Sequence, residues 1–527
     1  MVDGASLQAV AGRKLFGPDA PAYRRVGLEV TVFEANATVG GCIWTEQLPS
    51  GYRLERGAID HGMILGVADE LGLARFGLEY AFRDVSVGAG FGDRARLLFH
   101  RDLSKTLAGF GGLDPREIEG YRRLSELGAG LLGMMDAFTT PPSLAQIAEL
   151  GSVAGFDPLR TVLASAEKVV GAHVADPHLA SALTMYGALS QVPPWLPGTG
   201  LFGLLLAGSH GHGAGRPIGG SVQLVNALTR ALEAAGGTVR TSAAVVSIGR
   251  SGAETRITTA AGDTATFDRV VSALDVARTA RLMAEPVPEL DEAARMVTSG
   301  SLNVAEFKVD LALSAEAEPG RFGHPEAIWL LQQHPGSMAR SFGEIAAGIC
   351  PSEPAMLWAS PSALDPSAAP EGGGVAWLST FVPARLRHGE WTGAEVSRHA
   401  ERVIDGYQAI TGISLRDRIV EKHVAGPLDW ERRTGARFGN PNHIDMTVDQ
   451  MFSLRPGAGR GYRTAVPWLY LTGAGTFPGG GLSGVPGKNA ALTVLHDLGR
   501  RRSRPAESST ISALVRGWRM YRSLRKR

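Results

Sequence analysis

Apolar residues recur along this chain with two periods, one typical of strands and one typical of helices. Residues 28–34 form a run rich in β-branched side chains that ends in an acid, and turn-forming residues follow at once. This pattern predicts a buried strand with a tight exit. Residues 221–235 carry apolar positions at helical spacing and are followed by Gly236 and Gly237, which predicts a helix with a glycine C-cap.

The rest of the chain mixes both patterns. The pattern is mostly helical over residues 80–210, and a further helix is predicted at residues 484–498. Shorter runs predict strands at residues 238–248, 269–273, 302–311, 355–360, 375–382 and 467–472. The order of these segments predicts an α/β domain of the nucleotide-binding type, assembled from at least three separated segments, with two insertions that form a second domain.

Composition narrows the class of protein. The length of 527 residues excludes a peptide module. The chain has 53 Lys and Arg against 52 Asp and Glu, and this net charge of +1 disfavours a nucleic-acid-coating or disordered protein. Its two cysteines, Cys42 and Cys350, cannot build a disulfide framework. The first thirty residues hold no apolar run of signal-peptide length. We therefore expect a cytoplasmic protein without nucleic acid as a partner.

The last 28 residues differ from the rest. This tail begins at Arg500, ends at Arg527 and holds ten basic residues and one acid. Apolar residues such as Leu514 and Trp518 recur there at helical spacing. One hypothesis is an amphipathic helix on an anionic membrane surface, which would make the protein peripheral to the inner membrane face. The alternatives are a helix packed on the body or a disordered solubilising tail.

Glu34 stands at the carboxyl end of the strand predicted at residues 28–34, which would be the second strand of a dinucleotide-binding βαβ unit. A carboxylate there is placed to accept hydrogen bonds from the ribose hydroxyls of an adenosine. Gly40 and Gly41 follow, and their missing side chains let the backbone approach a pyrophosphate. The alternative is a surface acid that ends an ordinary strand before an ordinary turn.

The glycine turn expected upstream of Glu34 is only partly present. The one candidate spans residues 4–9, in which Gly4 and Ser6 would hold phosphate at a helix N-terminus, and only residues 1–3 remain for the first strand. Either this fingerprint is degenerate, or the chain lacks its true start. The further alternative is that residues 1–22 are a poorly ordered remnant.

The densest motif lies near the other end. Seven glycines fall within the fifteen residues 473–487, between a predicted strand and a predicted helix. Such a loop can bring many backbone N–H groups and a helix dipole against a phosphate or the carbonyl edge of a flavin. A purely structural loop would not need this density of glycine.

Four segments together resemble a known family. They are Glu34-Ala-x4-Gly40-Gly41-x3-Thr45, Pro217-Ile-Gly219-Gly220, residues 270–273 and residues 473–491. This set is similar to the phytoene dehydrogenase-related FAD-dependent oxidoreductases, and the likeness runs from about residue 27 to residue 498. It implies a Rossmann-like FAD-binding domain at residues 1–78, 212–298 and 456–500, with an inserted α+β substrate domain at residues 79–211 and 299–455. Residues 501–527 are then the basic amphipathic tail.

The resemblance also assigns roles. Glu34 would bind the ribose of FAD, Gly40 and Gly41 its pyrophosphate, with Thr45 in the same motif, and Val246 would hold adenine through its backbone. Gly475, Gly480 and Val485 would lie near the ribityl chain and the flavin ring, and Gly473 and Gly479 would also bind the cofactor. His443 lies in a loop that could face the substrate side of the ring, the alternative being a hydrogen-bonded structural histidine. His210 and His212 suit no common metal cage, so we assign no metal site.

These roles lead to a functional hypothesis. We expect an FAD-dependent desaturase, saturase or isomerase that acts on a hydrophobic substrate such as a polyene or an isoprenoid. The reaction would move a hydride between the substrate and flavin N5. One alternative keeps FAD but oxidises an amine or another small metabolite. Another is a scaffold that has lost flavin and acts by binding.

Overall fold

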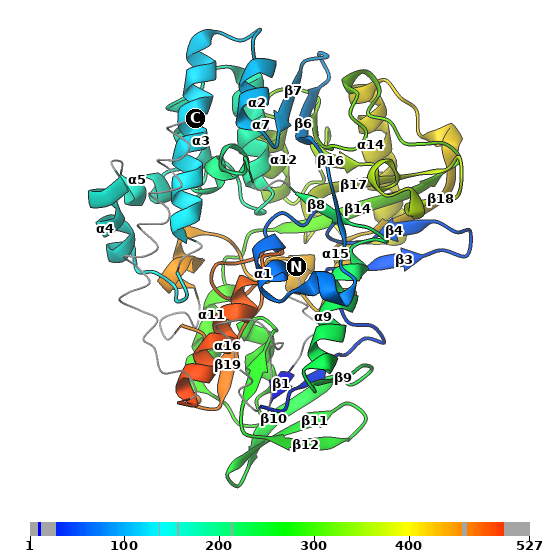
Figure 1. Ribbon diagram of the computed structural model, residues 1–527. Helices are drawn as coiled ribbons and strands as arrows, with labels where there is room; N and C mark the ends of the chain where they lie inside the picture. The colour runs from blue at the N-terminus through cyan, green and yellow to red at the C-terminus, as the bar shows by residue number, and fades with distance from the viewer. Residues whose placement is uncertain are drawn as a thin grey trace.

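The computed structural model describes residues 9–11, 28–135, 138–154, 157–211, 214–455 and 461–499. Gly4, Ser6 and the basic tail from residue 501 lie outside these residues. Two sheets organise the described chain, a five-stranded sheet in the lower half of Figure 1 and a seven-stranded sheet in its upper half.

The five-stranded sheet has the order β19-β13-β1-β2-β9. Its strands are β1 (Ala9–Ala11), β2 (Thr31–Phe33), β9 (Thr238–Arg240), β13 (Val270–Ser272) and β19 (Leu469–Leu471). β2 and β9 are parallel, as are β13 and β19, whereas β1 is antiparallel to both β2 and β13. Because β1 opposes both neighbours, the other four strands run in one direction and their carboxyl ends meet at one edge. The predicted assembly of this domain from separated segments is confirmed.

The first strand differs from the prediction. The candidate strand at residues 1–3 lies outside the described residues, whereas Ala9, the last residue of the candidate turn at residues 4–9, begins β1 and pairs with Phe33. The middle of the sheet is therefore filled by a reversed strand. An antiparallel ladder supplies the missing backbone hydrogen bonds of β2 and β13 without a crossover helix.

Helices and a small meander flank this sheet. The meander consists of β10 (Val245–Ser251), β11 (Glu254–Thr259) and β12 (Thr264–Phe267). The helices are α1 (Leu65–Glu70), α9 (Val222–Ala234), α10 (Val276–Leu282), α11 (Pro288–Thr298) and α16 (Val485–Asp497). Both helices predicted here, α9 and α16, are confirmed. The single strand predicted at residues 238–248 is wrong, because the chain leaves β9 after Arg240 and Ser242 adopts a positive φ of 52° before β10 begins.

The seven-stranded sheet has the order β18-β14-β17-β16-β15-β6-β7. Its strands are β6 (Val85–Phe91), β7 (Arg96–His100), β14 (Val304–Leu313), β15 (Ile328–Gln332), β16 (Met356–Ala359), β17 (Gly374–Pro383) and β18 (Ile419–Ala425). β6 pairs with β15 in parallel, so the two predicted insertions share one sheet. The helical prediction for residues 80–210 is wrong over its first twenty residues, which form β6, β7 and the short strand β5 (Tyr80–Phe82).

Apolar clusters cover both faces of this sheet. On one face, Leu330 belongs to a buried cluster shared with α3 (Pro115–Met135) and α7 (Pro177–Ala188). On the other, its neighbours Trp329 and Leu331 pack with α14 (Gly393–Thr411). Burial on both faces explains why strands such as β15 and β17 read as continuous apolar runs. The remaining helices of the α3 region are α2 (Leu103–Gly109), α4 (Leu144–Ala154), α5 (Pro158–Leu163), α6 (Ala166–Gly171) and α8 (Leu205–Gly208).

Further short elements complete the described fold. They are the pair β3 (Thr45–Gln47) and β4 (Arg53–Glu55), the strand β8 (Gly215–Pro217), which pairs with β5, and the helices α12 (Ser337–Ala346), α13 (Pro361–Leu364) and α15 (Pro427–Thr434). Within the residues described, the structure contains no helix with the length and apolar character needed to cross a membrane.

Candidate functional site

The carboxyl ends of four strands of the five-stranded sheet meet at one edge, and two predicted site residues, Glu34 and Gly473, follow such strands. Glu34 comes directly after β2, Asp275 shortly after β13, and Gly473 shortly after β19. In open α/β sheets, ligands bind outside the carboxyl ends of the strands. The topology therefore brings the early acid and the late glycine-rich loop to the same edge.

Glu34 is fully buried and firmly held. Its backbone N–H donates to Arg240 O at 2.8 Å, and its carbonyl accepts from Ala243 N at 2.8 Å. Its carboxylate Oε1 accepts from Asn36 N at 2.7 Å and from Asn36 Nδ2 at 2.8 Å. Asn36 was missed by the sequence reasoning, although an Asx residue two positions after a strand is a turn signal.

Val246 follows the segment, residues 240–243, that is bonded to the backbone of Glu34. The register of β10 against β11 shifts between Val245 and Ser247, so Val246 has no cross-strand partner there. Its side chain is 49% exposed. A bulge of this kind frees backbone groups from the ladder, which is what a backbone contact to adenine requires. The role of Val246 stays a prediction.

The three other residues of the early motif lie in different surroundings. Gly40 has a φ of 132°, and an added Cβ would lie 2.3 Å from Ile43 O, so the turn itself demands glycine there. Gly41 lines a cavity of about 330 Å³ together with Trp44 and Arg433. Thr45 donates instead to the buried carboxylate of Glu55 at 3.0 Å, which gives it a structural partner.

The glycine-rich loop joins β19 to α16. Gly473 has a φ of 85°, and an added Cβ would lie 2.9 Å from Ala273 O, whereas a Cβ at Gly479, where φ is 116°, would lie 2.6 Å from Met446 Cε. Gly475 differs, because a Cβ there meets its nearest neighbours only at ordinary contact distances. Gly480 lies in the same loop, and Val485 is the first residue of α16.

His443 lies against this loop. A Cβ on Gly475 would be 3.7 Å from the ring nitrogen Nδ1 of His443. The histidine is 5% exposed, and neither ring nitrogen has a hydrogen-bond partner among the described residues. Burial lowers its pKa to about 4, so the imidazole is neutral at pH 7. The structure therefore shows no hydrogen bond from this ring to the described residues, and the role of His443 stays a prediction.

A buried arginine fixes the relation between His443 and the loop. Arg455 is 1% exposed and donates to the carbonyl of Ala474 in the glycine-rich loop. It also donates to Asn442 O at 3.4 Å and to Gln450 O at 2.9 Å. No sequence pattern indicates a role for Arg455, because its acceptors are backbone carbonyls up to nineteen positions away.

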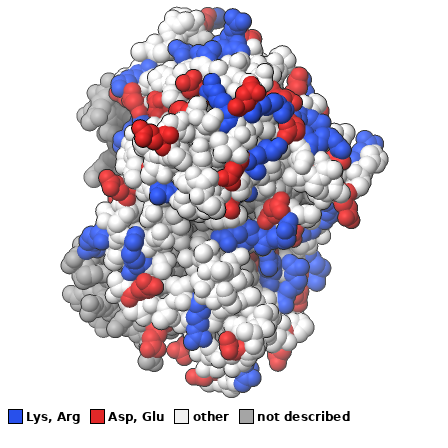
Figure 2. Space-filling model, turned by 90° about the vertical axis from the view of Figure 1, so that its right-hand side faces the viewer, with Lys and Arg blue, Asp and Glu red and all other residues white. Residues whose placement is uncertain are grey.

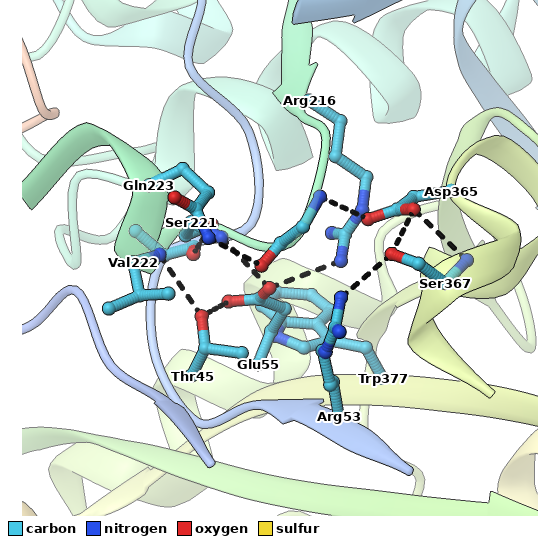
Figure 3. Close-up of polar contacts among 12 residues, drawn as sticks. Thr45, Arg53, Glu55, Arg216, Ser221, Val222, Gln223, Asp365, Ser367 and Trp377 are labelled. Atoms are coloured by element: carbon cyan, nitrogen blue, oxygen red, sulfur yellow. Dashed lines mark hydrogen bonds and ion pairs between the residues drawn. The ribbon is translucent and has the colours of Figure 1, made fainter. Parts of the chain in front are cut away.

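A second polar network holds the turn that begins α9 (Figure 3). Glu55, fully buried on β4, accepts from Arg216 Nη2 at 3.1 Å and from Ser221 N at 3.0 Å. Asp365 accepts from Gly219 N at 2.8 Å. The turn at residues 217–220 is thus bonded to carboxylates from two distant segments. The sequence flagged the glycines of this turn but not their acidic partners.

A third polar group lies on β14, where Glu306, Lys308 and Asp310 share one face. Lys308 Nζ donates to Asp310 at 2.7 Å, and Arg56 Nη1 donates to the same carboxylate at 2.6 Å. Burial lowers the pKa of Lys308 to about 8. Burial raises the pKa of Glu306 to about 7, although Ser379 and Gln191 donate hydrogen bonds to it.

These residues fit a bound flavin dinucleotide. Such a cofactor needs a carboxylate for its ribose, backbone N–H groups for its phosphates and a place with little water for its ring. Glu34 and the glycine-rich loop are the residues predicted for the first two needs, and they follow strands that end at one sheet edge. The two ring nitrogens of His443, buried beside Gly475 without a partner among the described residues, indicate a polar group at that point.

Comparison with known proteins gives a consistent result. A family model described as "Flavin containing amine oxidoreductase" matches residues 11–485. The "Pyridine nucleotide-disulfide oxidoreductase domain-containing protein 2" of Rattus norvegicus is 32% identical over 203 residues, 37% of this chain, and the match spans only 35% of that relative. A "Phytoene desaturase (lycopene-forming)" of a Paracoccus species is 26% identical over 410 residues, 75% of this chain and 77% of the relative.

Among solved structures, putrescine oxidase bound to putrescine superposes with a TM-score of 0.54 at 15% identity, over 89% of this chain and 93% of that one. At this identity the likeness concerns the fold. The predicted fold class and the predicted cofactor, FAD, are confirmed. The individual site residues and the domain boundaries stay predictions.

Proposed function

The chain belongs to the flavin containing amine oxidoreductases, and from this premise we propose that it is a desaturase, saturase or isomerase of a hydrophobic substrate. The substrate class is a polyene or isoprenoid hydrocarbon. When bound, FAD supplies the hydride acceptor or donor at its N5 atom. The residues of the chain bind the cofactor, orient the substrate and exclude water.

The observation that supports this proposal is the apolar surrounding of the glycine-rich loop. Phe477 within the loop, together with Met446, Met451 and Phe452, belongs to the same buried cluster as α3 and α7. Such a layer suits a substrate without polar groups, because apolar surface is what it can bury. An amine substrate would instead favour acids and aromatic rings around the site. The name of the Paracoccus relative, a phytoene desaturase, supports the same class.

Two groups of the chain are placed for chemistry near the loop. His443 stays neutral at pH 7 and can accept or donate one hydrogen bond beside Gly475. Asp445, two residues on, has its pKa raised to about 6 by burial and accepts from Leu302 N at 2.6 Å. We infer that His443 contacts the bound substrate or cofactor and that Asp445 fixes the loop carrying it.

Purification with spectroscopy tests the cofactor and substrate together. The purified chain is expected to absorb at about 450 nm as an oxidised flavoprotein. Anaerobic addition of a polyene hydrocarbon in detergent, but not of putrescine, should bleach this band if the chain is a desaturase. Bleaching by the amine alone would contradict the hydrocarbon proposal and favour an amine oxidase. A colourless protein that does not take up added FAD would point to a binding scaffold.

A pair of alanine substitutions separates cofactor binding from folding. Gly475→Ala is sterically permitted, so the variant should fold while its new methyl group weakens binding of FAD. Gly487→Ala, in α16 with open space around the added Cβ, is the matched control and should retain full flavin content. Flavin content after gel filtration is the readout. Equal flavin content in both variants would remove Gly475 from the flavin site.

The basic tail supports a further part of the proposal, attachment to a membrane where such a substrate dissolves. Each basic residue near an anionic surface contributes about 1 kcal/mol. Deleting residues 501–527 should abolish sedimentation of the protein with anionic liposomes. Neutral liposomes are the control and should sediment neither the full chain nor the shortened chain. Unchanged sedimentation of the shortened chain would refute a role for the tail.

A further inference from the structure

A cavity of about 470 Å³ lies directly beside the early acid motif. Ala35 and Asn36, which follow Glu34, form one wall. Helices α10 and α15 and the residues after α15 supply the others. The lining holds one acid, Glu431, and five arginines, namely Arg278, Arg281, Arg432, Arg433 and Arg437. So many cations around one half-open space is an unusual balance for a purely structural gap.

Most of these arginines have no carboxylate partner. Arg432 forms an ion pair with Asp429, with Nη2 2.5 Å from Oδ1. Arg278 donates to the carbonyl of Gly435, and Arg433 Nη2 donates to Thr38 Oγ1 at 3.3 Å. Among the described residues, no ion pair joins Arg278, Arg281, Arg433 or Arg437 to an acid. The cavity therefore carries an excess of positive charge that an anion would balance.

Burial of two of these arginines, Arg433 and Arg437, makes their unbalanced positive charge less favourable. The Nε atom of Arg433 is buried and has no hydrogen-bond partner among the described residues, which leaves one strong donor unused. Burial also lowers the pKa of Arg433, although the carboxylate of Glu34 acts in the opposite direction. Burial lowers the pKa of Arg437, with further contributions from the neighbouring charges of Arg385 and Arg281. Cations crowded in this way repel one another until an anion binds.

Arg433 also connects this cavity to the glycine motif. It lines the second cavity, of about 330 Å³, that contains Gly41. Asn36 Nδ2 donates to the carbonyl of Arg433 at 3.3 Å, so the end of α15 lies over the loop between Glu34 and Gly41. α15 stands near the middle of the molecule in Figure 1, and Figure 2 shows basic side chains gathered across the middle of the adjacent face.

We propose that the arginine-lined cavity binds the phosphate groups of a phosphorylated ligand. Guanidinium groups recognise phosphate oxygens through paired, charge-assisted hydrogen bonds, and several of them around one space favour a diphosphate over a single phosphate. Two sources share this chemistry: the diphosphate of FAD itself and a separate phosphorylated small molecule. The inference does not depend on which substrate the protein oxidises.

Calorimetric titration of inorganic pyrophosphate into the full-length protein tests the site. Arg281 and Arg437 are the residues to change, because neither has an ion pair and both are at least partly exposed. The double variant Arg281→Gln and Arg437→Gln should bind pyrophosphate at least about tenfold more weakly than the native chain. Arg295→Gln, at an exposed ion pair with Glu292 on α11, is the control and should bind within about twofold.

Two forms of the protein distinguish the sources. If the diphosphate of FAD fills the cavity, FAD-free protein binds pyrophosphate and FAD-loaded protein does not. The double variant then also loses affinity for FAD but not for riboflavin, measured by flavin fluorescence. If a separate ligand fills it, FAD-loaded protein still binds pyrophosphate. Failure of both forms to bind pyrophosphate, or equal affinity in the native chain and the double variant, would overturn the proposal, whatever the substrate assay gives.

Discussion

Glu55 gives the sharpest test of how the structure is held together. Its carboxylate is fully buried and bonded to Arg216, which is itself 2% exposed, as well as to Thr45 and the backbone of Ser221. Glu55→Gln keeps the shape and removes the charge. The amide oxygen can still accept from Ser221 N, but the guanidinium of Arg216 is left buried without a counter-charge.

The expected cost follows from that geometry. Neutralising one partner of a buried ion pair destabilises a protein by about 3–5 kcal/mol. This is a large share of a typical total of about 5–15 kcal/mol. Urea denaturation measures the change as the shift in midpoint multiplied by the slope. The control is Arg53→Gln, whose hydrogen bonds to Ser367 and Gln47 are exposed and should be worth less than about 1 kcal/mol.

A double variant decides whether the charge is the cause. Adding Arg216→Met to Glu55→Gln removes the unbalanced cation, so the double variant should be more stable than Glu55→Gln alone. Two results would refute the reasoning. One is a loss of unfolding free energy below about 1 kcal/mol for Glu55→Gln. The other is a double variant whose loss of unfolding free energy equals the sum of the losses of the two single variants.

Three further predictions concern buried groups. The pKa of Glu306 is raised to about 7 when folded, so the native chain should lose up to about 3 kcal/mol of stability as pH rises from 4.5 to 7, because only the unfolded chain ionises there. Glu306→Gln should flatten this slope in urea titrations at several pH values. The pKa of His443 is lowered to about 4, so stability should fall as pH drops from 6.5 towards 4, and His443→Gln should remove that loss, whereas an unchanged acid slope would contradict it. Gly479→Ala should cost about 1–3 kcal/mol through its φ of 116° and the contact with Met446, measured against the sterically permitted Gly475→Ala.

Much of the fold was predictable because its signals are local. The strand before Glu34, the helix after Gly220 and the strand and helix around the glycine-rich loop all carry their own periodicity and end signals. The strand β6 was missed, because it is buried on both faces and shows no alternation, while Gly88 and Gly90 within it lie where an added Cβ would meet Trp329 and Phe322. Only the folded chain shows why glycine is needed there.

The candidate site was predictable to a smaller extent. Glu34, Gly475 and His443 were all named from the sequence, and the structure places His443 beside Gly475. The long-range bonds in the surrounding structure were not predictable. Glu55 and Arg216 are 161 positions apart, and Arg433 reaches Thr38 across 395 positions. A single charged residue gives no sign of which distant partner it will meet, because the pairing is set by the fold.

The parallel pairs of the five-stranded sheet have a consequence for how the chain is made. Thr31 of β2 pairs with Thr238 of β9, and Val270 of β13 pairs with Leu469 of β19. In each pair the second strand is synthesised about 200 residues after the first. At a synthesis rate of about 5–20 residues per second, an early β13 spends roughly 10–40 s on the ribosome before its partner emerges. During that time an unpaired apolar edge is open to solvent and to other chains. Translation of this protein should therefore depend on chaperones that shield nascent strands, and slowing the ribosome should increase its aggregation.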